Sequence, residues 1–291
     1  MRRGLIVTAD DFGRALPINE AVEDAHRNGI LTAASLMVTG DAVADAVDRA
    51  RRLPSLAVGL HVALLDARPA LPPSEIPALV EADGRFGRRP LALGVSLFLD
   101  REVRRQALAE MRAQFELFRA TGLPLDHVDC HHHYHLHPTV FDLLLPLACA
   151  YGAAGMRVPF EPPLPAWRAG GGGLLRRLGG LVHWRRAWRM RRRIRRAGLM
   201  VNDNMFGNHD SGAMDAALLG ALLEHLPPGL SEVYAHPATG TWEPFPLPAR
   251  YRATDEHRAL ADPELAERAC RLNLRLTTFS RELARLARRG W

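Results

Sequence analysis

Six histidines lie between His127 and His137, although the whole chain has only thirteen. Neutral imidazole is the commonest protein ligand for a catalytic metal ion and the usual proton carrier near neutral pH. A His-rich tract can also be a loose metal-binding surface without catalytic function. This tract, however, follows an apolar stretch at 123–125 and begins in polar–apolar alternation at 127–129. That pattern is typical of a short buried strand running into a loop, and it favours a metal-binding or catalytic role.

Other polar residues stand in matching places, at or near the ends of predicted strands. Each one alone could be a helix cap or a loop residue. In a (β/α) barrel the carboxyl ends of the strands form the face that carries the active site, so their joint placement predicts a site there. These candidate residues are Asp10 and Asp11, His61, His131 and His133, Arg157, and His236.

The adjacent acids Asp10 and Asp11 have two interpretations. Acidic residues often precede helices, where they cap free N–H groups and interact favourably with the helix dipole. Two close carboxylates at the end of a buried strand also repel each other, and a cation removes that repulsion. One carboxylate can then ligate the ion while its neighbour acts as a base. His61 follows an apolar strand and could equally be a hydrogen-bonded structural residue.

Strand alternation restricts which histidines can act together. If His131 faces the mouth of the fold, Asp129 and His133 lie on the same side and His132 points away. We therefore do not expect three consecutive histidines to bind one ion.

One carboxylate and two imidazoles, from Asp11, His61 and His131, make a ligand set that leaves coordination positions open. An open position is what a metal needs to activate water or to polarise a carbonyl group. We expect one divalent metal ion, zinc or magnesium; manganese or cobalt would also suit such ligands to some degree.

Predicted strands and helices alternate along the chain, without an internal repeat. Strands are expected at residues 4–10, 33–38, 56–64, at the start of the histidine tract, and at 155–158, 199–202, 231–235 and 274–279. The alternation implies a parallel sheet, either open or closed. Seven or eight such units favour an irregular, TIM-like (β/α) barrel. We expect one domain over 1–291, with a basic helical insertion at 161–198.

Composition indicates an ordinary soluble protein, with 47% hydrophobic and 24% charged residues. No apolar run is long enough to span a membrane, and acidic residues follow the first residues too soon for a signal peptide. The three cysteines, Cys130, Cys149 and Cys270, are too few for a disulfide framework, which favours a reducing, cytoplasmic location.

Four motifs resemble the signature of the YdjC-like carbohydrate deacetylases, in order and spacing. They are Thr8-Ala9-Asp10-Asp11-Phe12-Gly13, Gly59-Leu60-His61, His127-Val128-Asp129-Cys130-His131-His132-His133 and Ala235-His236-Pro237. The resemblance implies an irregular (β/α) barrel that removes acetyl groups from N-acetylated sugars with a divalent metal.

The resemblance also implies roles for individual residues. Asp11, His61 and His131 match the metal-ligand positions. Asp10 matches the general base and His236 the general acid. Arg157 matches a basic position that orients the base. His133 and Asn204 are expected to contact the substrate, and no role is assigned to His132, His135 or His137.

All 38 basic residues are arginines, and eleven of them lie between 162 and 198, where there is no acidic residue. One interpretation of the segment 174–197 is a solvated helix packed on the barrel. Another is a basic amphipathic helix, with Trp184 and Trp188 at the interface of an anionic membrane. No recognised motif supports nucleic-acid binding.

This segment and the motif at 202–207 resemble the branch of the family associated with hopanoid biosynthesis (HpnK-type). That branch implies an N-acetylglucosaminyl hopanoid as substrate. We therefore expect a metal-dependent deacetylase of a lipid-linked N-acetylglucosamine. The alternatives are a deacetylase of soluble chito-oligosaccharides and a non-catalytic, metal-containing sugar- or lipid-binding barrel.

Overall fold

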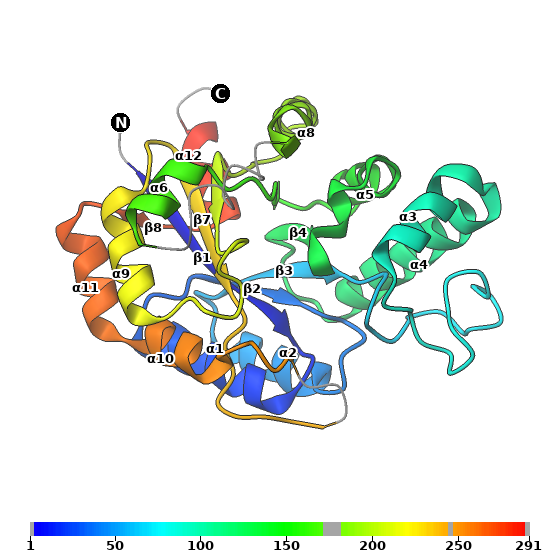
Figure 1. Cartoon of the computed structure of the whole chain (residues 1–291), viewed down its shortest axis with the longest axis horizontal. Coiled ribbons are helices and arrows are strands. Elements are labelled where there is room, and N and C mark those ends of the chain that lie inside the picture. Colours follow the sequence, from blue (N-terminus) through cyan, green and yellow to red (C-terminus); the bar gives the residue numbers. More distant parts are fainter. Residues whose placement is uncertain (1–2, 171–181, 244–246, 289–291) are drawn as a thin grey trace.

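The computed structural model describes residues 3–170, 182–243 and 247–288, and it is built around one parallel sheet (Figure 1). Its strand order is β5-β4-β3-β2-β1-β7-β6, and β8 pairs with the beginning of β1. The strands are β1 (Gly4–Phe12), β2 (Ala33–Leu36), β3 (Ala57–Val62), β4 (His127–Cys130), β5 (Gly155–Met156), β6 (Asn204–Phe206), β7 (Leu230–Ala235) and β8 (Arg275–Leu276).

The sheet curls into a TIM-like half-barrel, which confirms the predicted fold class. All pairings between the strands are parallel, as the alternation of strands and helices requires. The single-domain assignment, with 161–198 as an insertion, stays a prediction.

Helices cover the outside of the sheet (Figure 1). They are α1 (Leu16–Asn28), α2 (Val43–Arg52), α3 (Pro90–Leu99), α4 (Arg101–Ala120), α5 (Pro138–Ala150), α6 (Pro163–Arg168), α8 (Trp184–Arg196), α9 (Ala216–His225), α10 (Ala253–Ala261), α11 (Pro263–Arg271) and α12 (Phe279–Ala287), with a 3₁₀ segment, η1, at His131–Leu136. Among these described helices, none is long and apolar enough to cross a bilayer.

One expectation about these elements was wrong. The strand expected at 199–202 forms later in the chain, at Asn204–Phe206. In the expected range, Met200 makes an isolated parallel bridge with Gly155, and the Asn202 side chain holds the neighbouring loop through hydrogen bonds with Val158. The long connection after β3 ends in α3, whose proline at the first helical position suits a helix start. The predicted basic helix is present from Trp184, and its part at 174–181 lies outside the described residues.

Strand β1 is buried along its whole length and ends in an irregularity that shapes the site. Its register with β2 shifts between Ala9 and Phe12, and Asp11 has a left-handed φ of 65°. Adjacent residues of a regular strand point to opposite faces, whereas a bulge redirects one of them. Both Asp10 and Asp11 thereby line the same pocket.

Gly59 allows a close packing contact directly under the site. A Cβ atom at this position would lie 2.4 Å from Nε2 of the buried His127 ring. We predict that Gly59→Ala lowers the free energy of unfolding by about 1–3 kcal/mol, because the extra methyl group overpacks a rigid contact. Denaturant unfolding measures this, with Gly240→Ala as the matched control, since no atom lies within 4 Å of its added Cβ. Equal stabilities of the two variants would contradict the contact.

Candidate metal centre and active site

Three possible ligand atoms meet at the carboxyl ends of β1, β3 and β4. Asp11 Oδ1 lies 3.1 Å from His131 Nδ1 and 3.5 Å from His61 Nε2, and the two imidazole nitrogens are 3.3 Å apart. All three side chains are buried, and Asp11 Oδ1 has no hydrogen-bond partner. A buried carboxylate oxygen without a donor, facing two imidazole nitrogens, fits a divalent cation.

His61 is oriented by a second carboxylate. Its Nδ1 is 2.8 Å from Asp129 Oδ1, which directs Nε2 toward Asp11. Metal-binding histidines are commonly fixed in this way by a carboxylate on the far ring nitrogen. Burial lowers the pKa of His61, but the charges of Asp129, Asp10 and Asp11 outweigh it and raise the pKa to about 9. The cluster therefore attracts positive charge, as a cation site must.

Asp11 is held in one orientation by Arg14. Arg14 Nη1 donates to Asp11 Oδ2 over 3.0 Å, so the other oxygen stays turned toward the histidines. Burial raises the pKa of Asp11, yet the charges of His131 and Arg14 bring it well below its usual value. Asp11 is thus a carboxylate at neutral pH, ready to ligate a metal.

Asp10 is bound by a different arginine. Arg157 donates from Nη1 to Asp10 Oδ2 over 2.7 Å and from Nη2 to Oδ1 over 2.8 Å. Such a two-point contact fixes the plane of a carboxylate. Each oxygen keeps a second lone pair. Asp10 lines the pocket, so it can accept a proton there while Arg157 orients it.

Arg157 is fully buried and joins two further carboxylates. It contacts Asp129 through Nη1, and its Nε donates to Glu232 over 3.0 Å. Burial lowers the pKa of Arg157, but Asp10, Asp129 and Glu232 raise it well above its usual value. The guanidinium of Arg157 therefore links Asp10 to Asp129, the carboxylate that orients His61.

Below the cluster, a chain of hydrogen bonds continues to the far side of the sheet. Ser35 Oγ donates to Asp129 Oδ2 over 3.1 Å and lies 3.0 Å from His127 Nε2. His127 Nδ1 is 3.0 Å from Asp126, which in turn accepts from the backbone N–H of Ser280 at the start of α12. The side chains from Ser35 to Asp126 are all buried, and together they fix Asp129.

The pocket above the cluster has a wall that sequence reasoning missed. Asp66 comes from the loop after β3, Asn208 and Ser211 from the loop after β6, and Arg250 and Tyr251 from the loop after β7. Such positions lie in connections of irregular length, where alternation predicts nothing. Their only sequence signal was that they come after strand ends.

His236 lies on this wall, as expected from its place after β7. Its backbone N–H donates to Glu256 over 2.7 Å, and its Nδ1 is 3.5 Å from Ser211 Oγ. Ser211 Oγ in turn is 2.9 Å from Tyr251 Oη. The ring packs between the aromatic rings of Tyr234 and Tyr251. His236 is therefore held at the pocket, next to the end of β1, because Ala9 and Ala235 are paired in register.

The structure corrects the expected direction of His132. Strand alternation ends at Cys130, because His132 and His133 both have left-handed φ angles, 56° and 51°. His132 consequently lines the pocket beside His131, with ring centroids 4.1 Å apart, and does not point away. His133 also lines the pocket, and its ring lies 4.8 Å from that of Tyr234.

The remaining histidines of the tract contact neighbouring parts of the fold. His135 is buried with Nε2 3.0 Å from the carbonyl oxygen of Arg157, and burial lowers its pKa to about 4. His137 contacts Phe98 of α3.

Asn204, expected to contact the substrate, lies elsewhere. It begins β6 and pairs with Ser231 near the start of β7, whereas the pocket residues Tyr234 and His236 come at the other end of that strand. Asn204 is not among the described residues that line the pocket, because β6 begins at Asn204. Its contact with a substrate stays a prediction.

A curled parallel sheet with a buried Asp-His-His cluster at its carboxyl edge defines an α/β half-barrel with a cluster that could hold a metal ion. Residues 4–271 match the family model described as "YdjC-like protein". The chain therefore belongs to the YdjC-like family.

Among curated proteins, the chain is 38% identical over 161 residues to a carbohydrate deacetylase of Brevibacillus brevis, covering 55% of this chain and 59% of that protein. It is 35% identical over 156 residues to a chitooligosaccharide deacetylase of Salmonella schwarzengrund, covering 53% and 59%. The matched region thus spans about three-fifths of these relatives.

Among solved structures, a protein described as a candidate for cellobiose-phosphate cleavage, from Enterococcus faecalis V583, superposes with a TM-score of 0.74. The superposition covers 96% of this chain and 98% of that one, at 22% identity. At this identity the likeness establishes the shared fold alone.

The geometry predicts which side chains determine metal affinity. His61→Ala removes a proposed ligand, and Asp129→Asn replaces the charged carboxylate that orients His61 with a neutral amide. We expect Asp129→Asn to weaken zinc or magnesium binding about 10–100-fold, and His61→Ala to weaken it more. Equilibrium dialysis of each folded variant measures this, with the exposed His225→Ala as control. Wild-type affinity in His61→Ala would exclude the site.

Proposed function

We propose that this protein is a metal-dependent hydrolase that removes the acetyl group from an N-acetylglucosamine moiety. We base this proposal on the different surroundings of the two adjacent acids. Asp11 faces two imidazole nitrogens, whereas Asp10 is oriented separately by Arg157. Amide hydrolysis needs both an electrophilic centre and a base beside it. The names of the relatives support the same chemistry.

Asp11, His61 and His131 would hold one divalent ion, zinc or magnesium. When bound, such an ion supplies Lewis-acid polarisation of the acetyl carbonyl and lowers the pKa of water. A mixed set of oxygen and nitrogen donors suits either metal.

Asp10 acts as the general base in this proposal. Its carboxylate is fixed by Arg157 on one side and lines the pocket on the other, so it can accept a proton from the water that attacks the acetyl carbon. Arg157 positions Asp10 and holds Asp129, and it is too deeply buried to reach the substrate itself.

His236 acts as the general acid. It follows β7 beside the end of β1, where Ala9 and Ala235 are paired, and it lines the same pocket as Asp10. There it can donate a proton to the sugar nitrogen as the C–N bond breaks. Ser211, 3.5 Å from Nδ1, positions the ring. His133 lines the pocket beside Tyr234 and is proposed to contact the sugar.

For the substrate we propose a hopanoid glycolipid reached by a cytoplasmic protein that contacts the membrane through 174–197. The described part of that segment supports this idea, since α8 buries one stripe and exposes Trp184, Trp188 and most of its arginines. A soluble chito-oligosaccharide is the second candidate, and the name of the Salmonella relative favours it.

If Asp10 is the general base, replacing it should slow acetate release without affecting metal binding. Asp10→Asn keeps the ligand set and should retain metal, but it should release acetate about 10²–10⁴-fold more slowly, because the amide cannot accept the proton. Acetate assays on N-acetylated sugars, together with metal analysis, measure this. Asp48→Asn, an exposed change on α2, is the matched control. Unchanged turnover in Asp10→Asn would remove Asp10 from the mechanism.

Comparison of acceptors separates the candidate functions. We expect acetate release from a lipid-linked N-acetylglucosamine to exceed release from soluble chito-oligosaccharides, and a chelator to abolish both. Faster turnover of the soluble acceptors would favour the second candidate. Metal binding without acetate release from either acceptor would indicate a non-catalytic barrel.

A further inference from the structure

Helix α3 presents an apolar surface at the catalytic edge of the fold. Its exposed side chains are Leu91 (86% exposed), Leu99 (80%), Val95 (57%) and Phe98 (56%). The helix lies in the connection that follows β3, and the carboxyl end of β3 carries His61. α3 contacts Tyr134 and His137, which follow the carboxyl end of β4, so the apolar surface belongs to the same edge as the pocket.

Contacts from the histidine tract hold α3 in this orientation. Tyr134 Oη donates to the carbonyl oxygen of Pro90 over 2.9 Å, and the ring of Phe98 lies 4.3 Å from that of His137. Arg104 Nη1 donates to the carbonyl oxygen of Phe98 over 2.8 Å and so caps the end of the helix. The leucines are thus exposed on a fixed helix.

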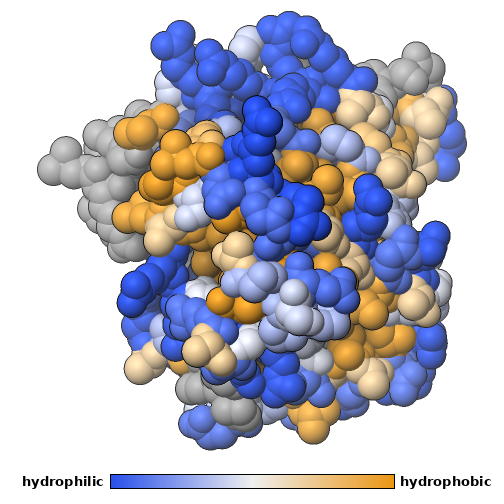
Figure 2. Space-filling view, turned by 90° about the vertical axis from the view of Figure 1, so that its right-hand side faces the viewer, coloured by the Kyte–Doolittle hydropathy of each residue, from blue (hydrophilic) through white to orange (hydrophobic). Residues whose placement is uncertain are grey.

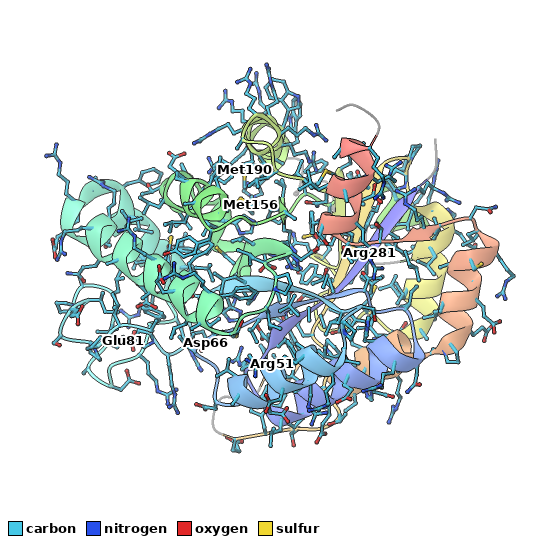
Figure 3. All side chains as sticks on the ribbon, turned by 180° about the vertical axis from the view of Figure 1, so that it is seen from behind. Arg51, Asp66, Glu81, Met156, Met190 and Arg281 are labelled. Carbon is cyan, nitrogen blue, oxygen red and sulfur yellow. The ribbon has the colours of Figure 1, made fainter. Side chains whose placement is uncertain are left out.

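Helix α8 adds positive charge and two exposed indoles. Its buried stripe consists of Ala187, Met190 and Ile194, and Figure 3 shows Met190 directed toward Met156. Trp184 is 52% and Trp188 48% exposed.

The arginines of the two halves of α8 differ in their partners. Toward its end, Arg193 pairs with Asp142 and Arg195 with Asp203. Over the first half, no carboxylate of the described residues lies within ion-pair distance of Arg185 or Arg189. The beginning of α8 is therefore electropositive.

His137 connects the two helices. Its ring contacts Phe98 of α3. Burial lowers the pKa of His137, and the nearby charge of Arg186 on α8 lowers it further. Since α8 leads into β6 of a parallel sheet, its first residues lie toward the carboxyl edge. Figure 2, which faces the side with α3 and α4, shows an apolar area adjoining a hydrophilic one.

We propose that α3 and the beginning of α8 form one surface that docks on an anionic lipid bilayer. The leucines of α3 enter the acyl boundary, the tryptophans lie at the interface, and Arg185, Arg189 and Arg192 contact headgroup phosphates. The inference deepens the proposed lipid-linked substrate and rests on it, because the surface would place the pocket edge against the membrane. The basic segment 174–197 alone did not indicate that α3 belongs to this surface.

Co-sedimentation with vesicles tests the surface. The full chain should bind vesicles of phosphatidylcholine and phosphatidylglycerol, with binding weakened by salt, and should bind pure phosphatidylcholine poorly. Leu91→Ser/Leu99→Ser should weaken binding about tenfold. Arg185→Gln/Arg189→Gln/Arg192→Gln should weaken it about a hundredfold. Leu16→Ser on α1, 53% exposed, is the matched control for the leucines.

Wild-type vesicle binding by either multiple variant would overturn the proposal. So would a change in oligomeric state of the leucine variant with unchanged vesicle binding, since the surface would then join two copies of the chain. Because vesicle binding is measured without turnover, it can succeed or fail independently of acetate release. Both variants should keep wild-type acetate release from soluble acceptors, since none of the substituted residues lines the pocket.

Discussion

The buried ion pairs of Arg157 are the interaction on which the site depends. Removing a guanidinium from water is costly unless its charge and its donors are matched, and here Asp10, Asp129 and Glu232 match them. These three acids come from β1, β4 and β7. The same contacts that neutralise Arg157 therefore connect three strands of the sheet beneath the pocket.

Two neighbouring aspartates can have different functions because two arginines hold them apart. The left-handed backbone at Asp11 turns its carboxylate toward Arg14 and the histidines, while Asp10 remains on Arg157. Asp129 connects the surroundings of Asp10 with those of Asp11, since it binds both Arg157 and His61. The proposed metal site and the proposed base are thus held by one connected set of charges.

Periodicity and the order of the elements were enough to predict part of the site. Parallel strands with polar residues at their ends placed His61, His131 and His236 around one pocket. Features that depend on backbone exceptions or on loops of irregular length could not be predicted in this way. The left-handed turn at His132 reversed its direction, and the shifted sixth strand removed Asn204 from the pocket. The pocket wall beyond β7 likewise depends on tertiary packing, because no short-range pattern specifies it.

A crystal structure with a divalent ion bound, located by anomalous scattering, tests the division of the two aspartates most directly. The ion should contact Asp11 Oδ1, His61 Nε2 and His131 Nδ1, while both oxygens of Asp10 stay on Arg157. An ion ligated by Asp10, with its contact to Arg157 broken, would contradict this division.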